Sequence, residues 1–243
     1  MATIRQNKNG TWYVRYDAGY DGEGKRIQKY KGGFKLKRDA EDFLIEIQHS
    51  LNSGTYIKPQ KLLLFEYLND WLEYRKDELS PTTWEGYEVN IRCHINPIIG
   101  GIGLQDLRPQ HIRNLYKTLQ KDRTLKIDGK QRSFKPLSNK SILYVHRVLS
   151  KALEDAYMDE IINSNPTKRV KPPSPDKYEA NFLTIDEIKE MIFKFKDDEL
   201  YIPVLLTVLL GLRRGETLGL QWENIDFDNN IVKIRNNYTM FEG

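Results

Sequence analysis

The stretch Gly211-Leu212-Arg213-Arg214-Gly215-Glu216, continued by Leu218-Gly219-Leu220-Gln221-Trp222, carries the most information in this sequence of 243 residues. Residues 201–210 precede it without a single charge, which predicts a buried helix that ends at Gly211. Residues 216–222 predict a second short helix with its apolar side toward the same core. A strand is expected over residues 231–235, where apolar and basic residues alternate.

Arg213 at the end of such a helix is suited to binding a phosphate. The orientation of its guanidinium is set in advance, and its planar fork matches two phosphate oxygens. Glu216, three residues further on, can hold that fork. The same spacing also fits an ordinary surface ion pair, with Arg214 as a solvated neighbour. Spacing alone leaves both interpretations open.

The run from Gly211 to Asp226 resembles the first catalytic box of the tyrosine recombinases, the phage-integrase family. The resemblance implies DNA strand exchange by a tyrosine that attacks a backbone phosphate and forms a 3′-phosphotyrosyl intermediate, with no metal or other cofactor. It also implies that Arg213 stabilises charge on the scissile phosphate and that Glu216 supports Arg213. One preorganised donor of this kind is worth roughly 3 to 4 kcal/mol.

The other catalytic residues of that family follow this box: a lysine on a β-hairpin, a His-x-x-Arg box, a further histidine or tryptophan, and the tyrosine. All histidines of this sequence precede the box: His49, His94, His111 and His146. Lys233 comes early for the lysine, and Tyr238, at the expected end of a strand, comes too early for the nucleophile. We therefore expect a sequence that is C-terminally truncated relative to an active recombinase and that cuts no DNA by itself.

Composition predicts a multi-domain cytoplasmic protein that binds a polyanion. Lys+Arg number 38 and Asp+Glu 34, and the bases concentrate in residues 1–38 and 121–151, which predicts two separate contacts with nucleic acid. Neither a membrane span nor a secretion signal is expected. Cys93 is the single cysteine, which fits a reducing compartment. Cys93-His94 predicts a buried thiol beside a packed histidine rather than a metal site.

Residues 1–56 predict a small three-stranded sheet and a helix. Residues 11–16 and 26–31 are aromatic and β-branched runs joined by a turn at 21–24, and a helix from about residue 37 has an apolar face. That face consists of Ala40, Phe43, Leu44 and Ile47. The open, basic face of the sheet fits a DNA groove, and a solvated hairpin without DNA contact is the alternative. The segment resembles the AP2-like arm-binding domain of phage and conjugative-transposon integrases. Its candidate DNA contacts are Arg15, Arg26, Gln28 and Lys29.

Residues 62–171 predict four helices that resemble the SAM-like core-binding domain of the same family. Ser80-Pro81 is a helix start, and the last helix is expected from Ser138 to about Ile162. Residues 121–135 are expected to form a flexible loop close to phosphates, and residues 165–173 a semi-rigid basic linker. The candidate DNA contacts are Thr82, Lys140, Arg147, Lys151, Lys168 and Arg169. A solvated helix face is the alternative for any one of the lysines.

Residues 178–243 predict the start of a mainly helical catalytic domain with a small sheet. Thr184 and Glu187 form a capping box there, and exposed apolar surface is expected. The whole is thus a multi-domain α+β protein, expected to be a site-specific integrase of a prophage or mobile element. Its expected partners are double-stranded DNA with arm-type and core-type sites, a homotetramer on DNA in the complete enzyme, and DNA-bending and excision factors.

Two alternatives to a recombinase remain. One is a truncated, inactive DNA-binding remnant or regulator that occupies the same DNA sites without cutting them. The other is a transcription factor that uses the amino-terminal sheet, which leaves the box around Arg213 unexplained.

Overall fold

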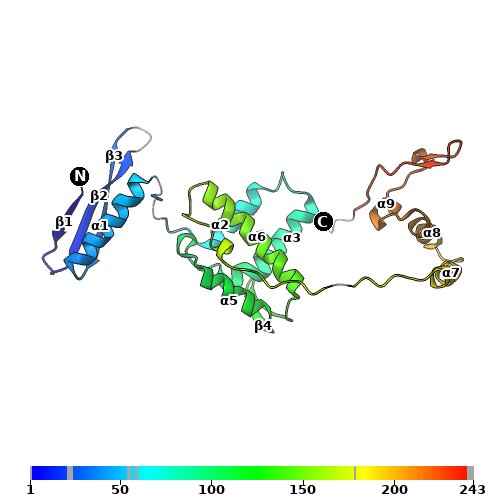
Figure 1. Ribbon diagram of the computed structural model, residues 1–243, viewed down its shortest axis with the longest axis horizontal. Helices are drawn as coiled ribbons and strands as arrows, with labels where there is room; N and C mark the ends of the chain where they lie inside the picture. Colours follow the sequence, from blue (N-terminus) through cyan, green and yellow to red (C-terminus); the bar gives the residue numbers. More distant parts are fainter. Residues whose placement is uncertain (1, 21–23, 54–55, 58–59, 178, 240–243) are drawn as a thin grey trace. The chain divides into compact units, whose positions relative to one another are not determined.

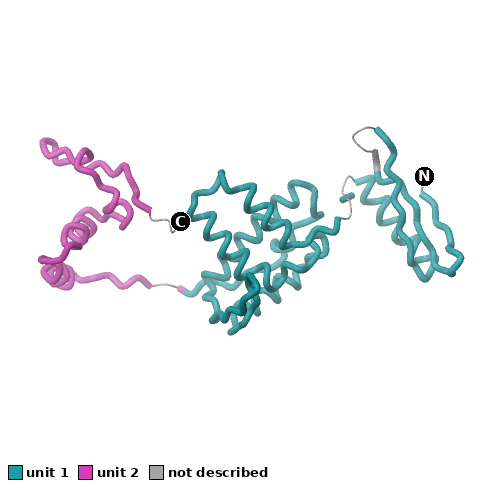
Figure 2. The backbone as a smooth tube through the Cα atoms, turned by 180° about the vertical axis from the view of Figure 1, so that it is seen from behind, with its two compact units in different colours: residues 1–176 teal, residues 177–243 magenta. Residues whose placement is uncertain are grey.

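The computed structural model describes residues 2–20, 24–53, 56–57, 60–177 and 179–239. The fold is mixed α+β, and it divides into two compact units, unit 1 (residues 1–176) and unit 2 (residues 177–243), seen in Figures 1 and 2. Unit 1 contains a small sheet with one helix and a larger helical part, whereas unit 2 is mainly helical with a two-stranded sheet. Most of the turn expected at 21–24 lies outside the described residues.

The small sheet of unit 1 has three antiparallel strands in the order β1 (Thr3–Gln6), β2 (Trp12–Tyr20) and β3 (Arg26–Phe34). Helix α1 (Lys37–Asn52) covers one face of this sheet (Figure 1). Val14, Tyr16 and Ala40 are buried between sheet and helix. The expected sheet and helix are confirmed, and β2 and β3 extend beyond the residues that the pattern predicted.

The helical part of unit 1 comprises α2 (Leu64–Tyr74), α3 (Pro81–Asn90), a π-helical turn (Ile91–Ile95), α4 (Asn96–Ile99), a 3₁₀ turn (Leu104–Asp106), α5 (Pro109–Leu119) and α6 (Asn139–Met158). The predicted start of α3 is confirmed, because Ser80 Oγ accepts the backbone N–H of Thr83 and Pro81 occupies the first helical position. Helix α6 ends at Met158, four residues before its expected end.

A single apolar core joins these helices. Helices α2, α5 and α6 contribute the apolar stripes that their periodicity predicted, and each fully buried leucine or isoleucine stabilises the fold by roughly 1.5 to 3 kcal/mol. The predicted core residues found buried are Leu64, Leu68, Trp71, Leu72, Ile112, Leu115, Tyr116, Leu119, Ile142, Val145, Leu149, Ala152, Leu153 and Ala156.

The expectation of a flexible loop over residues 121–135 is wrong. These residues form a hairpin of β4 (Arg123–Ile127) and β5 (Lys130–Phe134). Asp128 and Gly129 connect the strands with φ angles of 50° and 78°, as a two-residue type I′ turn requires. The Asp128-Gly129 pair is typical of a hairpin turn, whereas the many basic residues around it are typical of a loop.

The expectation of a linker over residues 165–173 is wrong for the first half of this segment. A 3₁₀ turn (Pro166–Arg169) lies against α6, with Asn165 and Thr167 buried. Asn165 Nδ2 donates to the carbonyl oxygen of Ser150, and the Thr167 hydroxyl donates to the Ser150 hydroxyl at 2.9 Å. Residues up to Val170 therefore belong to the helical part.

Unit 2 contains α7 (Ile185–Lys194), α8 (Tyr201–Leu210), α9 (Arg214–Leu218), a 3₁₀ turn (Trp222–Asn224), β6 (Ile225–Asp226) and β7 (Ile231–Val232). The capping box at the start of α7 is confirmed, because Glu187 accepts the backbone N–H of Thr184 and Thr184 caps the helix in return. Gly211 ends α8 with a φ of 67°, a left-handed conformation that favours glycine.

Four local expectations for unit 2 are wrong. The second helix is a five-residue helix followed by a separate 3₁₀ turn, and the strand spans two residues instead of five. Helix α8 is not buried: its main packing partners among the described residues are α7 and α9, and Leu209 on it is 69% exposed. Leu218 and Trp222, expected to face the core, are exposed as well. The predicted exposed apolar surface is confirmed. No helix among the described residues has the length and apolar character needed to cross a membrane.

Candidate nucleic-acid interface and phosphate site

Arg213 has an extended backbone and lies directly before α9. Hydrogen bonds hold both its backbone N–H and its carbonyl oxygen. Glu216 Oε2 accepts its backbone N–H at 2.9 Å, and Thr217 donates its own N–H and its hydroxyl to the carbonyl oxygen of Arg213. Leu212 beside it is one of the few buried side chains of this unit. Arg213 is thus positioned by its neighbours and not, as expected, by the end of a buried helix.

The side chain of Arg213 is open to a ligand. Glu216 Oε1 accepts from Nη1 at 2.9 Å, while the Arg213 side chain is 86% exposed. The backbone N–H of Arg213 is the largest cause of a lowered pKa of the Glu216 carboxyl, and the guanidinium adds to it. The remaining guanidinium N–H groups meet no acceptor among the described residues, so they are available to an anion.

Gly215 and Gly219 let a later segment approach α9. The backbone N–H of Tyr238 donates to the carbonyl oxygen of Gly215 at 2.8 Å. A Cβ atom at Gly219 would lie 2.9 Å from the carbonyl oxygen of Asn236. Tyr238 lies in irregular chain and not at the end of a strand, and Lys233 directly follows β7.

The sheet of unit 1 brings three of the four predicted contacts together on its open face. Arg15 donates to the side-chain oxygen of Gln28, and Arg26 forms an ion pair with Asp17 at 2.6 Å. Lys29 lies elsewhere. It is directly opposite Tyr16 in the register of β2 and β3, so it is on the face that α1 covers, where it is half-buried.

Three predicted contacts of the helical part line one shallow groove: Arg147, Lys151 and Lys168. Lys151 is paired with Asp155 at 2.7 Å and Lys168 with Glu154 at 2.6 Å, so both charges are partly offset. Lys140 is exposed in the first turn of α6, and Thr82 is exposed in the first turn of α3. These two residues do not line the groove.

Arg169 lines a second groove, which sequence reasoning missed. This basic groove, of about 400 Å³, lies between α5 and residues 169–174. Its other charged lining residues are Arg113, Lys117 and Lys171, and no carboxylate of the described residues lines it. Arg113 and Lys117 are four residues apart on the exposed side of α5, a spacing that could have revealed them.

Cys93 and His94 match their predicted structural role. Cys93 is buried, and His94 is half-buried with its Nδ1 at 3.2 Å from Arg123 Nη2. Burial is the largest cause of the lowered pKa of His94, and the charge of Arg123 lowers it further. Among the described residues, no three side chains of metal-binding type come together.

The sheet with its helix and the helical part have separate apolar cores, and each carries exposed basic side chains. A family model for an arm DNA-binding domain matches residues 3–51, and a model for the N-terminal SAM-like domain of phage integrases matches residues 63–120. In these two segments the chain is similar to the tyrosine recombinase family, also called the phage integrase family.

Similarity to curated relatives extends along most of the chain. A tyrosine recombinase XerC-like protein of Caldanaerobacter subterraneus is 29% identical over 239 residues, which cover 94% of this chain and 57% of the relative. The ICEBs1 integrase of Bacillus subtilis is 23% identical over 99% of this chain and 62% of its own length. The chain thus spans about three-fifths of the length of these two relatives.

Two solved structures share the fold. A lambda integrase dimer bound to a COC′ core site matches with a TM-score of 0.55 and 19% identity over 92% of this chain and 60% of that chain. The Tn1549 transposon integrase in complex with circular intermediate DNA matches with a TM-score of 0.58 and 18% identity over 72% of this chain and 55% of that chain.

Proposed function

We propose that this chain binds DNA as part of a site-specific recombinase, the integrase of a prophage or mobile element. Residues 1–56 hold arm-type DNA, residues 62–171 hold core-type DNA, and residues 178–243 are the first part of the catalytic domain. The observation that carries the proposal is the match of an arm DNA-binding domain model and of a phage-integrase SAM-like domain model to two parts of the chain, each with exposed basic side chains.

Arg213 has the catalytic role in this proposal. In the complete enzyme a tyrosine oxygen attacks the scissile phosphorus, a 3′-phosphotyrosyl bond forms, and the 5′ oxygen of the broken bond leaves. Negative charge grows on the non-bridging oxygens during this step, and a preorganised guanidinium stabilises it. Glu216 holds the guanidinium by the 2.9 Å contact, which supports its assignment as the positioning residue.

The partners follow from the same proposal. A lambda integrase tetramer bound to a Holliday junction matches this fold with a TM-score of 0.54 and 19% identity. We propose a homotetramer on DNA for the complete enzyme, acting on nucleoid DNA in the cytoplasm with DNA-bending and excision factors. The proposed DNA contacts are Arg15, Arg26, Gln28, Thr82, Lys140, Arg147, Lys151, Lys168 and Arg169. Lys29 is left out of this set because it lies on the face of the sheet that α1 covers.

A DNA-binding regulator without cleavage activity is the second candidate. The matched domain models and the basic groove all lie within residues 3–174, so they support DNA binding equally well in a protein that does not cleave DNA. Such a protein occupies arm and core sites and leaves the DNA intact.

A selection experiment with the 243-residue chain tests DNA binding. Duplexes bound from a randomised pool are sequenced, and two unrelated motifs are expected. Replacing Arg15 and Gln28 with alanine should remove one motif, and replacing Lys117 and Arg169 with glutamine should weaken the other. Enrichment of no motif, or equal loss of both motifs in each variant, contradicts the proposal.

A second experiment tests cleavage. The chain is incubated with a nicked duplex that carries the enriched core motif, and protein–DNA adducts are resolved on a denaturing gel. No covalent adduct is expected from residues 1–243. An adduct would show that this chain contains the nucleophile, and it would exclude the regulator without cleavage activity.

A further inference from the structure

The hairpin β4–β5, hereafter the ribbon, is anchored to the helical part by Arg123. The side chain of Arg123 is buried, and its Nη1 donates to the carbonyl oxygens of Leu119 and Lys135, on either side of the ribbon. The guanidinium also lies 5.1 Å from the centre of the Phe134 ring. Both strands are therefore fixed at their base.

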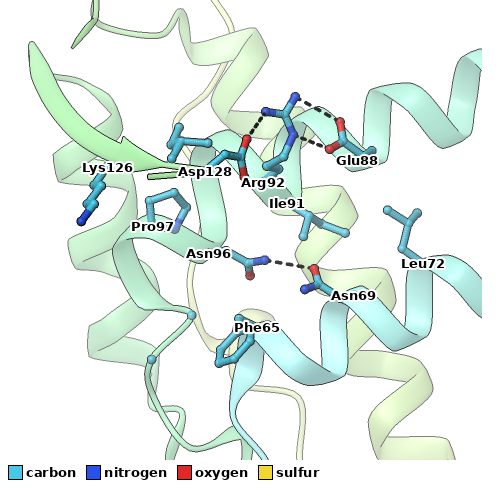
Figure 3. A pocket seen from close by; sticks show the side chains of 13 residues that line it. Phe65, Asn69, Leu72, Glu88, Ile91, Arg92, Asn96, Pro97, Lys126 and Asp128 are labelled. Carbon is cyan, nitrogen blue, oxygen red and sulfur yellow. Dashed lines mark hydrogen bonds and ion pairs between the residues drawn. The ribbon is translucent and has the colours of Figure 1, made fainter. Parts of the chain in front are cut away.

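The tip of the ribbon is held as well. Arg92, on the π-helical turn, donates to Asp128 Oδ2 at 3.2 Å and also binds Glu88, as Figure 3 shows. Ile127 next to Asp128 is buried. Since Asp128 is the only acid in residues 123–134, Arg92 offsets the single negative charge of the ribbon. The ribbon is thus a held, basic element and not a mobile loop.

The strand register gives the ribbon one fully polar face. Lys126 lies opposite Gln131, and Thr124 lies opposite Ser133, so these four exposed side chains share a face. Lys130 and Arg132 point to the other face along the outer strand β5, and both are exposed. The polar face thus carries hydrogen-bonding side chains, and the outer strand carries two cations beside it.

We propose that the ribbon enters the major groove of DNA, with Lys126 and Gln131 toward the base edges and Lys130 and Arg132 against phosphates. The major groove admits a two-stranded β-ribbon, and lysine and glutamine side chains pair with guanine and adenine edges there. The ribbon is a contact outside the matched SAM-like segment, which ends at residue 120. This inference rests on the DNA-binding function proposed above.

Two double variants of the 243-residue chain separate the assigned roles. On the core duplex enriched by the wild-type chain, Lys126→Ala with Gln131→Ala should weaken binding roughly 5- to 150-fold and abolish the preference at one or two base pairs. Lys130→Gln with Arg132→Gln should lower the log–log salt slope by about 1.8 on every duplex, since each phosphate contact contributes about 0.9.

Methylation interference locates the groove. Methylation of guanine N7 marks the major groove, so it should hinder the wild-type chain at the base pairs whose preference is lost, and it should not hinder the Lys126→Ala, Gln131→Ala variant there. Lys76→Gln is the matched control, because Lys76 belongs to the same helical part but is paired with Glu73. Thermal unfolding of each variant should equal that of the wild type, because the four side chains are exposed.

Three outcomes would count against the ribbon. If the chain binds and selects DNA but both double variants behave like Lys76→Gln, the ribbon makes no contact. If only the salt slope changes and N7 methylation has no effect, the ribbon lies along phosphates and does not enter the groove. If the wild-type chain binds no duplex at all, the proposed function itself fails.

Discussion

Glu216 holds Arg213 at two points: one carboxylate oxygen accepts the backbone N–H and the other accepts from Nη1, each at 2.9 Å. The first contact sets the start of α9, and the second restrains the guanidinium that we propose to meet the scissile phosphate. A single carboxylate therefore couples a local helix start to the placement of a catalytic side chain.

Replacing Arg213 with alanine should raise the pKa of the Glu216 carboxyl only part of the way to its ordinary value. The backbone N–H, the largest cause of the lowered pKa, remains in the variant, whereas the guanidinium is lost. Carboxyl chemical shifts measured by NMR over a pH series would give this value. Glu187 is the matched control. Thr184 lowers its pKa through similar backbone and side-chain contacts, and the pKa of Glu187 should be the same in the wild type and in Arg213→Ala.

The same contacts give a stability prediction for α9. A lowered folded-state pKa means that Glu216 stabilises the fold above the unfolded-state value and that this contribution is lost as pH falls through the folded-state value. Amide protection in α9 should therefore decrease on acidification. A Glu216 titration identical in the wild type and in Arg213→Ala would show that the side-chain pair is not formed in solution.

Gly215→Ala should destabilise unit 2 by about 1 to 3 kcal/mol, as overpacking commonly does. A Cβ atom there would lie 2.9 Å from the carbonyl oxygen of Tyr238 and would overlap the side chain of Asn237, so the segment must move away from α9. Urea unfolding with hydrogen exchange of the Tyr238 amide measures the effect. The helix preference of alanine, up to about 1 kcal/mol over glycine, opposes the loss.

Gly101→Ala is the control for this substitution, because nothing lies within 4 Å of a Cβ atom at Gly101. Its effect on unfolding should be close to zero. If Gly215→Ala and Gly101→Ala proved equally stable, the close approach of residues 236–238 to α9 would not exist in solution.

Local pattern predicted those parts of the fold whose causes are local. Leu68 and Ile112 are buried because each belongs to an apolar stripe of helical period, and Ser80 and Thr184 begin helices through contacts only three residues long. The same kind of signal was present at Asp128-Gly129. The residues that flank it are basic, a composition typical of a solvated loop, so composition and turn signal point to different structures there.

The rest of the fold depends on tertiary contacts, which a local sequence pattern does not contain. The position of Lys29 on the covered face follows from its register with Tyr16, and the burial of Arg123 follows from contacts with Leu119 and Lys135. Helix α8 is apolar enough for a core, but burial also requires neighbours on all sides. At the candidate site, the box identified Arg213 and Glu216, while the basic groove required the fold of residues 169–174 against α5.

Acidification should destabilise the helical part of unit 1 through His94 and His146. Burial is the largest cause of the lowered pKa in both, and the neighbouring Arg123 and Arg147 lower the two values further. Because the unfolded-state value is about 6.5, stability is fully present above that pH and is lost as pH falls toward the folded-state values. Urea unfolding at a series of pH values from 8 to 5 measures this loss.

His94→Gln should reduce that pH dependence, because the glutamine side chain oxygen can still accept from Arg123 without gaining a proton. His49→Gln, at an exposed position on α1, is the control and should leave the pH dependence as it is. An unchanged pH profile for the double variant His94→Gln, His146→Gln would refute the assignment of the loss to these side chains.

Unpaired lysines of the basic groove should contribute more to the salt dependence of DNA binding than paired lysines do. Lys117 and Lys171 line a groove without a carboxylate, so each phosphate contact releases a full counterion, and replacing both with glutamine should lower the log–log slope by about 1.8. Lys151 and Lys168 already share their charge with Asp155 and Glu154, and replacing both should lower the slope by less. Binding isotherms on one core duplex between about 50 and 200 mM salt compare the two double variants. Equal slopes for both variants would mean that DNA displaces the ion pairs of Lys151 and Lys168. The basic groove would then contribute no more to the salt dependence of binding than those two lysines do.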